Sequence, residues 1–209
     1  MNKINWVILL CVLASVWLWN SDPDVAIEYF AFSGDNLLKG RAWTLITALF
    51  LHVDLSHLLG NMIFLFVFGN TLEREVHAQK TLGVFLLGGV LSFLLSVFFY
   101  DPAIPLIGAS AAIFTLVAIV MLVKPLKFSF LFLMPQGLVA IIYLLYNLTA
   151  VYYGVAGNVA YISHIIGFSV GIPFGIAWSK DWVKNLLITI ALFILYIVII
   201  YFIQTMLAP

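Results

Sequence analysis

Long apolar runs separated by short polar segments make up most of the 209-residue chain. A helix that crosses a membrane needs about 20 mostly apolar residues, and unsatisfied backbone groups are too costly in hydrocarbon for irregular structure. The pattern therefore predicts seven helices, at residues 6–19, 55–72, 81–99, 110–123, 136–153, 160–178 and 182–207. The predicted fold class is an all-α polytopic membrane protein.

Composition agrees with this pattern, since 65% of the residues are hydrophobic and only 9% are charged. The formal net charge is zero and no block of like charges occurs, so a nucleic-acid partner is not expected. The single cysteine, Cys11, has no second thiol to pair with, and no spacing of histidines and carboxylates resembles a metal site. We therefore expect the lipid bilayer as a partner, and neither a metal nor a cofactor.

The distribution of Lys and Arg predicts an orientation, because positive residues near helix ends stay cytoplasmic. Seven of the nine fall on one side of the predicted membrane: Lys3, Arg74, Lys80, Lys124, Lys127, Lys180 and Lys184. Only Lys39 and Arg41 fall on the other side, in a long outer segment at 20–54. We therefore expect a cytoplasmic N-terminus, a C-terminus outside, and the plasma membrane of a prokaryote as the location.

Four polar residues inside or at the ends of predicted spans mark a candidate site, because polar groups are expensive there. Counted from the inner helix ends at about 1.5 Å per residue, Ser110, His164 and His57 lie at similar depths, within about 10 Å of the outer boundary. His57 and Asn61 are four residues apart and share a helix face. A serine nucleophile needs a neutral histidine and donors for an oxyanion, so the pattern indicates hydrolysis. Plain interhelical hydrogen bonding is the alternative.

The residues before Ser110 predict a non-helical approach to the fourth helix. Pro102 and Pro105 disfavour helix until about Ser110, and irregular backbone at membrane depth is tolerated where it lines a watery cavity. Gly108 permits close backbone approach, and the free N–H groups of a helix N-terminus stabilise negative charge. These features suit a hydrolytic site at the start of the helix.

A stripe of small residues predicts that the fourth and sixth helices pack closely. The stripe consists of Gly167, Gly171 and Gly175. Ala111 makes the fourth helix a suitable neighbour. Such a contact would bring His164 near Ser110.

Together these motifs resemble the rhomboid family over residues 43–175. The matching segments are 57–61 with Glu73, 108–110, and 163–167 with Gly171, and His52 resembles a histidine of that family's outer segment. The resemblance implies a rhomboid-like six-helix catalytic core at 1–178. Residues 179–209 would then be an inner loop and an additional seventh transmembrane helix.

The resemblance further implies an intramembrane serine endopeptidase that cleaves transmembrane segments of other membrane proteins through an acyl-enzyme. Ser110 would be the nucleophile and His164 its base, without an acidic third member. The oxyanion hole would use His57, Asn61 and the Ser110 backbone N–H. Supporting roles would fall to Gly108, Phe114 and His52.

Three positions depart from the family pattern. Ala111 follows the serine where glycine is common, and Phe114 stands where a tyrosine often supports the base histidine. The Trp-Arg pair of the outer segment reads Trp43-Thr44, which removes a cation expected to anchor that segment. The resemblance also implies that the loop at 154–158 acts as a cap and the fifth helix as a side gate.

Two other functions are compatible with polar residues inside membrane spans. A rhomboid-like pseudoprotease would bind membrane proteins without cutting them, but retention of Ser110, His164, His57 and Asn61 favours an enzyme. A small transporter or channel would line a permeation path with its polar residues. No inverted repeat is visible, and the polar residues gather at one depth instead of crossing the membrane.

Overall fold

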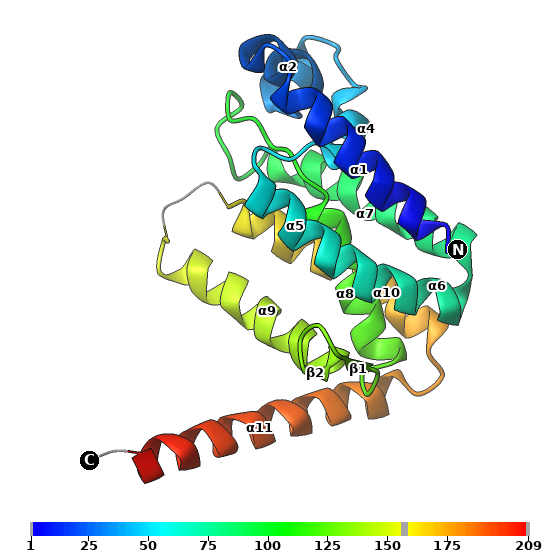
Figure 1. The fold of residues 1–209 in the computed structure, drawn as a ribbon, viewed down its shortest axis with the longest axis vertical. Helices are drawn as coiled ribbons and strands as arrows, with labels where there is room; N and C mark the ends of the chain where they lie inside the picture. The colour runs from blue at the N-terminus through cyan, green and yellow to red at the C-terminus, as the bar shows by residue number, and fades with distance from the viewer. Residues whose placement is uncertain (1, 156–158, 208–209) are drawn as a thin grey trace.

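The computed structural model describes residues 2–155 and 159–207 and consists almost entirely of helices (Figure 1). The long ones are α1 (Ile4–Trp19), α5 (Leu55–Phe64), α7 (Ala78–Ser96), α8 (Ser110–Val123), α9 (Gln136–Tyr152), α10 (Tyr161–Trp178) and α11 (Trp182–Leu207). In this part of the chain, four helical stretches are long and apolar enough to cross a membrane, and α1, α8 and α9 are shorter apolar helices. These seven segments correspond to the seven predicted spans, and the all-α polytopic fold class is confirmed.

The second span is longer than predicted. After α5 the helix continues through a π-helical turn, η2 (Leu65–Gly69), into α6 (Asn70–Val76), so it passes the predicted end at 72. The carboxylate of Glu73 on α6 accepts hydrogen bonds from the backbone N–H groups of Lys3 and Ile4, at 2.7 and 2.8 Å. This carboxylate therefore caps the free N–H groups at the start of α1.

Helix α8 is the central helix of the bundle. Every residue from 111 to 122 is buried, and α8 packs against α7, α9, α10 and α11 (Figure 1). A helix that is apolar on all sides is buried among other helices. The central place of α8 in the bundle therefore sets the position of its first residue, Ser110.

Three glycines join α10 to α8, as the sequence predicts. A Cβ added to Gly167 would collide with the Ala111 carbonyl oxygen, and one added to Gly171 would collide with the Thr115 carbonyl oxygen. At Gly175 the added atom would lie 2.8 Å from the Leu122 side chain. We call this contact the glycine seam. It lets two helix backbones approach to a distance that no larger residue permits.

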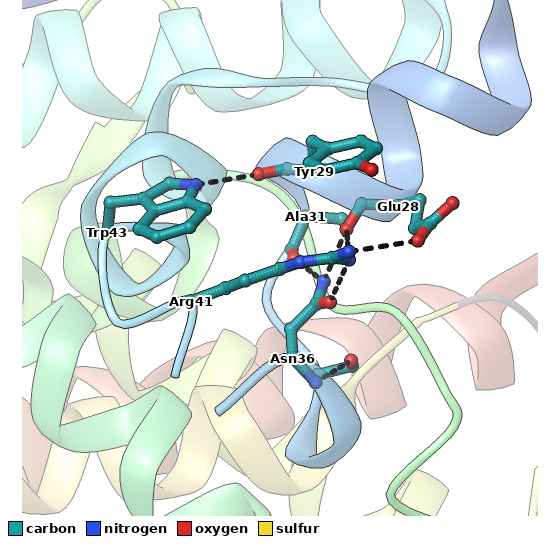
Figure 2. Close-up of polar contacts among 7 residues, drawn as sticks. Glu28, Tyr29, Ala31, Asn36, Arg41 and Trp43 are labelled. Atoms are coloured by element: carbon teal, nitrogen blue, oxygen red, sulfur yellow. Dashed lines mark hydrogen bonds and ion pairs between the residues drawn. The ribbon is translucent and has the colours of Figure 1, made fainter. Parts of the chain in front are cut away.

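The segment between α1 and α5 folds into α2 (Pro23–Phe30), α3 (Gly34–Leu38), α4 (Thr44–Thr47) and a 3₁₀ turn, η1 (Ala48–Phe50). Figure 2 shows the Arg41 side chain in the middle of this segment, where it points toward Glu28 of α2 and Asn36 of α3. The guanidinium pairs with Glu28 at 3.0 Å, donates to Asn36 Oδ1 at 2.9 Å, and lies 4.2 Å from the centroid of the Tyr29 ring. The indole N–H of Trp43 donates to the Tyr29 carbonyl at 2.8 Å.

The segment that lacks a cation at position 44 has one three residues earlier. Arg41 makes the contacts above within the segment, and the Thr44 hydroxyl donates to the Arg41 carbonyl at 2.8 Å. A long, flexible side chain can anchor a segment from more than one backbone position, so the residue at position 44 alone does not decide whether the segment is anchored.

The last helix, α11, packs on the bundle only through its first turns. The Asn185 amide donates to the Leu122 carbonyl at 2.7 Å, and Thr189 lies against Gly137 of α9. Beyond these turns α11 leaves the bundle with its apolar side chains exposed, crossing below it in Figure 1. A two-stranded hairpin, β1 (Phe128–Ser129) with β2 (Met134–Pro135), lies at the same end of the bundle.

Candidate active site

Ser110 is the first residue of α8, at the end of an extended approach. Leu106 forms an antiparallel bridge with Phe32, and the Gly108 N–H donates to the Ala48 carbonyl at 2.8 Å. The φ angle of Gly108 is 118°, in the region that favours glycine, and it turns the chain into the helix. The first N–H groups of α8, including that of Ser110, have no acceptor within the helix.

The structure brings Ser110 and His164 into hydrogen-bond contact. The Ser110 Oγ lies 2.8 Å from His164 Nε2, and the two residues come from the facing helices α8 and α10. Ser110 is partly exposed, whereas His164 is only 9% exposed. Gly167, one turn beyond His164, holds the two helices together at this point, so the separation of the two side chains follows from backbone packing.

Phe114, one helical turn after Ser110, covers a face of the His164 ring. Their ring centroids are 4.6 Å apart and the planes differ by 6°. The phenylalanine thus offers the flat aromatic surface that the family pattern assigns to a tyrosine. Stacking of this kind restricts tilting of the imidazole out of its plane.

His57 lies against the backbone just before Ser110. A Cβ on Gly108 would sit 2.8 Å from the His57 ring, so only glycine lets the imidazole approach this closely. Asp54 caps α5 by accepting the His57 N–H at 2.8 Å. The Ser56 hydroxyl and this N–H hold the pKa of the exposed Asp54 carboxyl below its usual range.

His52 is fully buried beside His57, with ring centroids 5.0 Å apart. One ring nitrogen lies 3.1 Å from the Ser15 hydroxyl of α1, and the other accepts from the Ala109 N–H at 3.4 Å. Trp19 donates to the His52 carbonyl at 2.9 Å. His52 therefore links α1 to the residue that precedes the serine, which is a supporting position.

Among the described residues, neither Asn61 nor His57 forms a hydrogen bond with Ser110, whose side chain bonds to His164. The amide nitrogen of Asn61 donates to the His57 carbonyl, four residues earlier in the same helix, at 2.9 Å. The side chain is 8% exposed. It shares the face of α5 that carries His57, as predicted from their spacing.

A fifth polar residue, Asn147 on α9, contacts the site and was missed from the sequence. Its Oδ1 lies 2.8 Å from His164 Nδ1, and the side chain is 2% exposed. The rule that identified the other four residues applies to it equally, since an amide in the middle of an apolar span is costly. Depth counting alone gave no reason to place it beside His164.

The second half of α9, residues 141–152, lies on the flank of the bundle. Tyr143, Tyr146 and Tyr152 are exposed there, whereas Asn147 and Ala150 are buried. The predicted cap at 154–158 follows this helix, and its residues 156–158 lie outside the described part of the chain.

Fold and site together define a polytopic helical membrane protein with a hydrogen-bonded serine and histidine at the start of a buried helix. Residues 39–181 match the family model described as the Rhomboid domain. The chain belongs to the rhomboid family.

Three relatives illustrate the range of similarity. The chain is 29% identical to RHOMBOID-like protein 12, mitochondrial, of Arabidopsis thaliana over 171 residues, which cover 72% of this chain and 50% of that protein. It is 26% identical to human (Homo sapiens) Rhomboid-related protein 3 over 162 residues, 71% of this chain and 39% of that protein. It is 25% identical to Rhomboid protease GlpG of Salmonella newport over 92 residues, 44% of this chain and 33% of that protein. The chain thus spans half or less of the length of these relatives.

Proposed function

We propose that this protein is an intramembrane serine endopeptidase that hydrolyses peptide bonds in or near transmembrane segments of other membrane proteins. The observation that carries the proposal is the 2.8 Å contact between Ser110 Oγ and His164 Nε2 at the N-terminus of a buried helix. Membership of a family in which a similar protein is named a protease supports it. Serine alone is a poor nucleophile, and a histidine base in contact with it is what activates it.

In the proposed reaction, Ser110 Oγ attacks the carbonyl carbon of the scissile peptide bond while His164 Nε2 takes the hydroxyl proton. The C–N bond breaks as the imidazolium returns that proton to the leaving amine, and an acyl ester remains on Ser110. Water then attacks the ester, giving a proton to His164, which passes it back to Ser110 Oγ. The products are an amine, a carboxylic acid and the free enzyme.

The negative charge of the tetrahedral intermediate needs donors already in place. The Ser110 N–H at the start of α8 is one, and the helix dipole adds to its effect. His57 and Asn61 are the proposed side-chain donors. Asn61 uses one amide N–H on the His57 carbonyl and retains a second for the oxyanion.

We further propose how the chain is divided and where it lies in the membrane. Residues 1–178 form the catalytic core, and residues 179–209 add an inner loop and α11. The Lys and Arg distribution favours a cytoplasmic N-terminus with the site near the outer surface, and the plasma membrane of a prokaryote is the location proposed with it. Substrates are then single-span or multi-span proteins that reach the site from the lipid.

The test is covalent labelling by a fluorophosphonate probe, together with cleavage of a single-span substrate by protein purified in detergent. We expect labelling of the wild type, and loss of labelling and cleavage in Ser110→Ala and His164→Ala. The control is Ser92→Ala, which removes a different serine hydroxyl, one that is fully buried and bonded to the Gly88 carbonyl on α7. Normal turnover in Ser110→Ala would overturn the proposal, and a folded wild type that binds the substrate but neither cuts nor labels would favour the pseudoprotease.

A further inference from the structure

Asn147 makes two hydrogen bonds that fix the orientation of its amide. The nitrogen Nδ2 donates to the Tyr143 carbonyl, one turn earlier in α9, at 2.8 Å. A carbonyl only accepts, so the NH₂ group must be the end that faces it. The oxygen Oδ1 is then the end that lies 2.8 Å from His164 Nδ1.

This orientation decides which nitrogen of His164 carries the proton. An amide oxygen cannot donate, so His164 Nδ1 must carry hydrogen to make the 2.8 Å contact. A neutral imidazole has one N–H, and the Nε2 lone pair therefore faces Ser110 Oγ. The opposite tautomer would place two lone pairs against each other at Asn147 and present N–H to a hydroxyl that must lose its proton.

We infer that Asn147 is a positioning residue, which holds His164 in the Nδ1–H tautomer so that Nε2 accepts the proton of Ser110. The inference rests on the proposed function of Ser110 and His164. Phe114 restrains the ring from its face, and Asn147 restrains rotation within the ring plane. The two contacts together leave the imidazole one orientation.

An amide suits this task at membrane depth. A carboxylate in the same place would add the cost of a buried charge in a low-dielectric setting, whereas a neutral amide supplies the acceptor without it. Asn147 is 2% exposed, so water does not compete for His164 Nδ1 in this arrangement. The competing view is that Asn147 is only an interhelical tie between α9 and α10.

The experiment compares Asn147→Leu, which keeps the approximate size and removes the acceptor, with Asn147→Asp, which keeps an acceptor. The matched control is Gln136→Leu, which removes another buried amide of α9, one bonded to Thr71 and not to His164. The protein has four histidines, so nitrogen-15 labelling of histidine gives few ring signals. The His164 signals are assigned by their loss in His164→Gln, and the same samples are assayed for kcat and KM.

We expect His164 in the wild type and in Gln136→Leu to be the Nδ1–H tautomer, and in Asn147→Leu to become mostly Nε2–H with a small remaining fraction of Nδ1–H. The wrong tautomer costs a serine protease about 10⁴ in kcat, and since Asn147→Leu still samples the right one, we expect a smaller loss of about 10- to 100-fold. KM should be unchanged, and Asn147→Asp should restore most of the rate and the Nδ1–H signal. A purely structural tie predicts instead lower stability with normal kcat and tautomer.

An Nε2–H tautomer in the wild type would overturn the inference, whether or not any variant folds. An unchanged tautomer and kcat in folded Asn147→Leu would do the same. A wild type without protease activity, in which Asn147→Leu still shifts the tautomer, would support the positioning contact and refute the proposed function alone.

Discussion

The two sides of His164 differ in how they are built. Toward α8, the glycine seam sets backbone against backbone, and every neighbour from 111 to 122 is buried. Toward α9, the second half of that helix buries only Asn147 and Ala150, and the exposed Tyr146 contacts Tyr161 of α10 at 3.4 Å. We infer that the backbone contact with α8 fixes the distance between Ser110 and His164. The hydrogen bond from His164 to Asn147 of α9 then fixes the tautomer of His164.

The difference separates two requirements of a base histidine. Its distance to the nucleophile tolerates little error, since a misplacement of about 1 Å can cost 10² in rate, and close packing supplies that accuracy. Its tautomer needs only one acceptor, which a loosely packed helix can provide. On this inference, a movement of the second half of α9 would separate Asn147 from His164 and leave the seam unchanged.

Outside the Ser110–His164 pair itself, the largest effect should come from breaking the glycine seam with Gly167→Ala. The added methyl group collides with the backbone carbonyl of Ala111, which cannot rotate away, so α8 and α10 must separate. Overpacking of this kind commonly costs about 1–3 kcal/mol. We expect at least about a 100-fold loss of turnover from the shift of His164 away from Ser110. Turnover and thermal unfolding in detergent would measure both.

Gly83→Ala on α7 is the control for that variant. A Cβ at Gly83 meets no atom within 4 Å, so the change tests glycine removal in an apolar helix without a collision. Alanine stabilises a helix by roughly 0.5–1 kcal/mol relative to glycine, and activity should be normal. Equal damage from the two substitutions would show that the seam is not a special contact.

The seam itself was predictable, and the Asn147 contact was not. Glycines at every fourth position of an apolar helix report close packing by their spacing alone. The pairing of Ser110 with His164 followed from depth, because both helices run through one bilayer of fixed thickness. Which flank of α10 faces α9, and hence that Asn147 meets His164, depends on helix rotation, which an almost uniformly apolar sequence does not encode.

The outer segment shows a similar limit. Pattern matching at position 44 indicated a missing anchor, but the anchoring cation comes from Arg41 through a side chain that spans several residues of backbone. The extended approach to Ser110 was predictable from Pro102, Pro105 and Gly108, because proline and glycine restrict or permit specific backbone angles. Backbone conformation set by proline and glycine could thus be predicted from the sequence, whereas the contacts of a long side chain could not.

An intermediate effect is expected in hydrogen exchange. Among residues 141–152 of α9 only Asn147 and Ala150 are buried, whereas residues 111–122 of α8 are buried throughout. Local opening of a helix is less costly where fewer contacts are lost. We expect amides of the α9 segment to exchange roughly tenfold faster or more, which corresponds to about 1.4 kcal/mol in opening free energy. Mass spectrometry of peptides from detergent-solubilised protein would measure this, and equal protection of both segments would show that α9 is held as firmly as α8.

The smallest effect should come from Thr115→Val, which removes a polar contact within the glycine seam. The Thr115 hydroxyl donates to the Gly167 carbonyl at 2.8 Å, across the same pair of helices that carries Ser110 and His164. Valine has nearly the same shape, so the backbone contact of the seam persists. Interhelical hydrogen bonds in membrane proteins average about 0.6 kcal/mol, and we expect a loss of that size in unfolding free energy with kcat within about twofold of wild type.

Thr115→Val and Asn147→Leu form a pair that tests the two sides of His164 against each other. Each removes one buried hydrogen bond to a residue of α10, at Gly167 and at His164. The seam is expected to fix the distance between Ser110 and His164, and Asn147 the tautomer of His164. Thr115→Val should then lower the unfolding free energy slightly and leave kcat unchanged, whereas Asn147→Leu should lower kcat. A large fall in kcat from Thr115→Val with normal stability would mean that polar contacts, and not backbone packing, set the distance between Ser110 and His164.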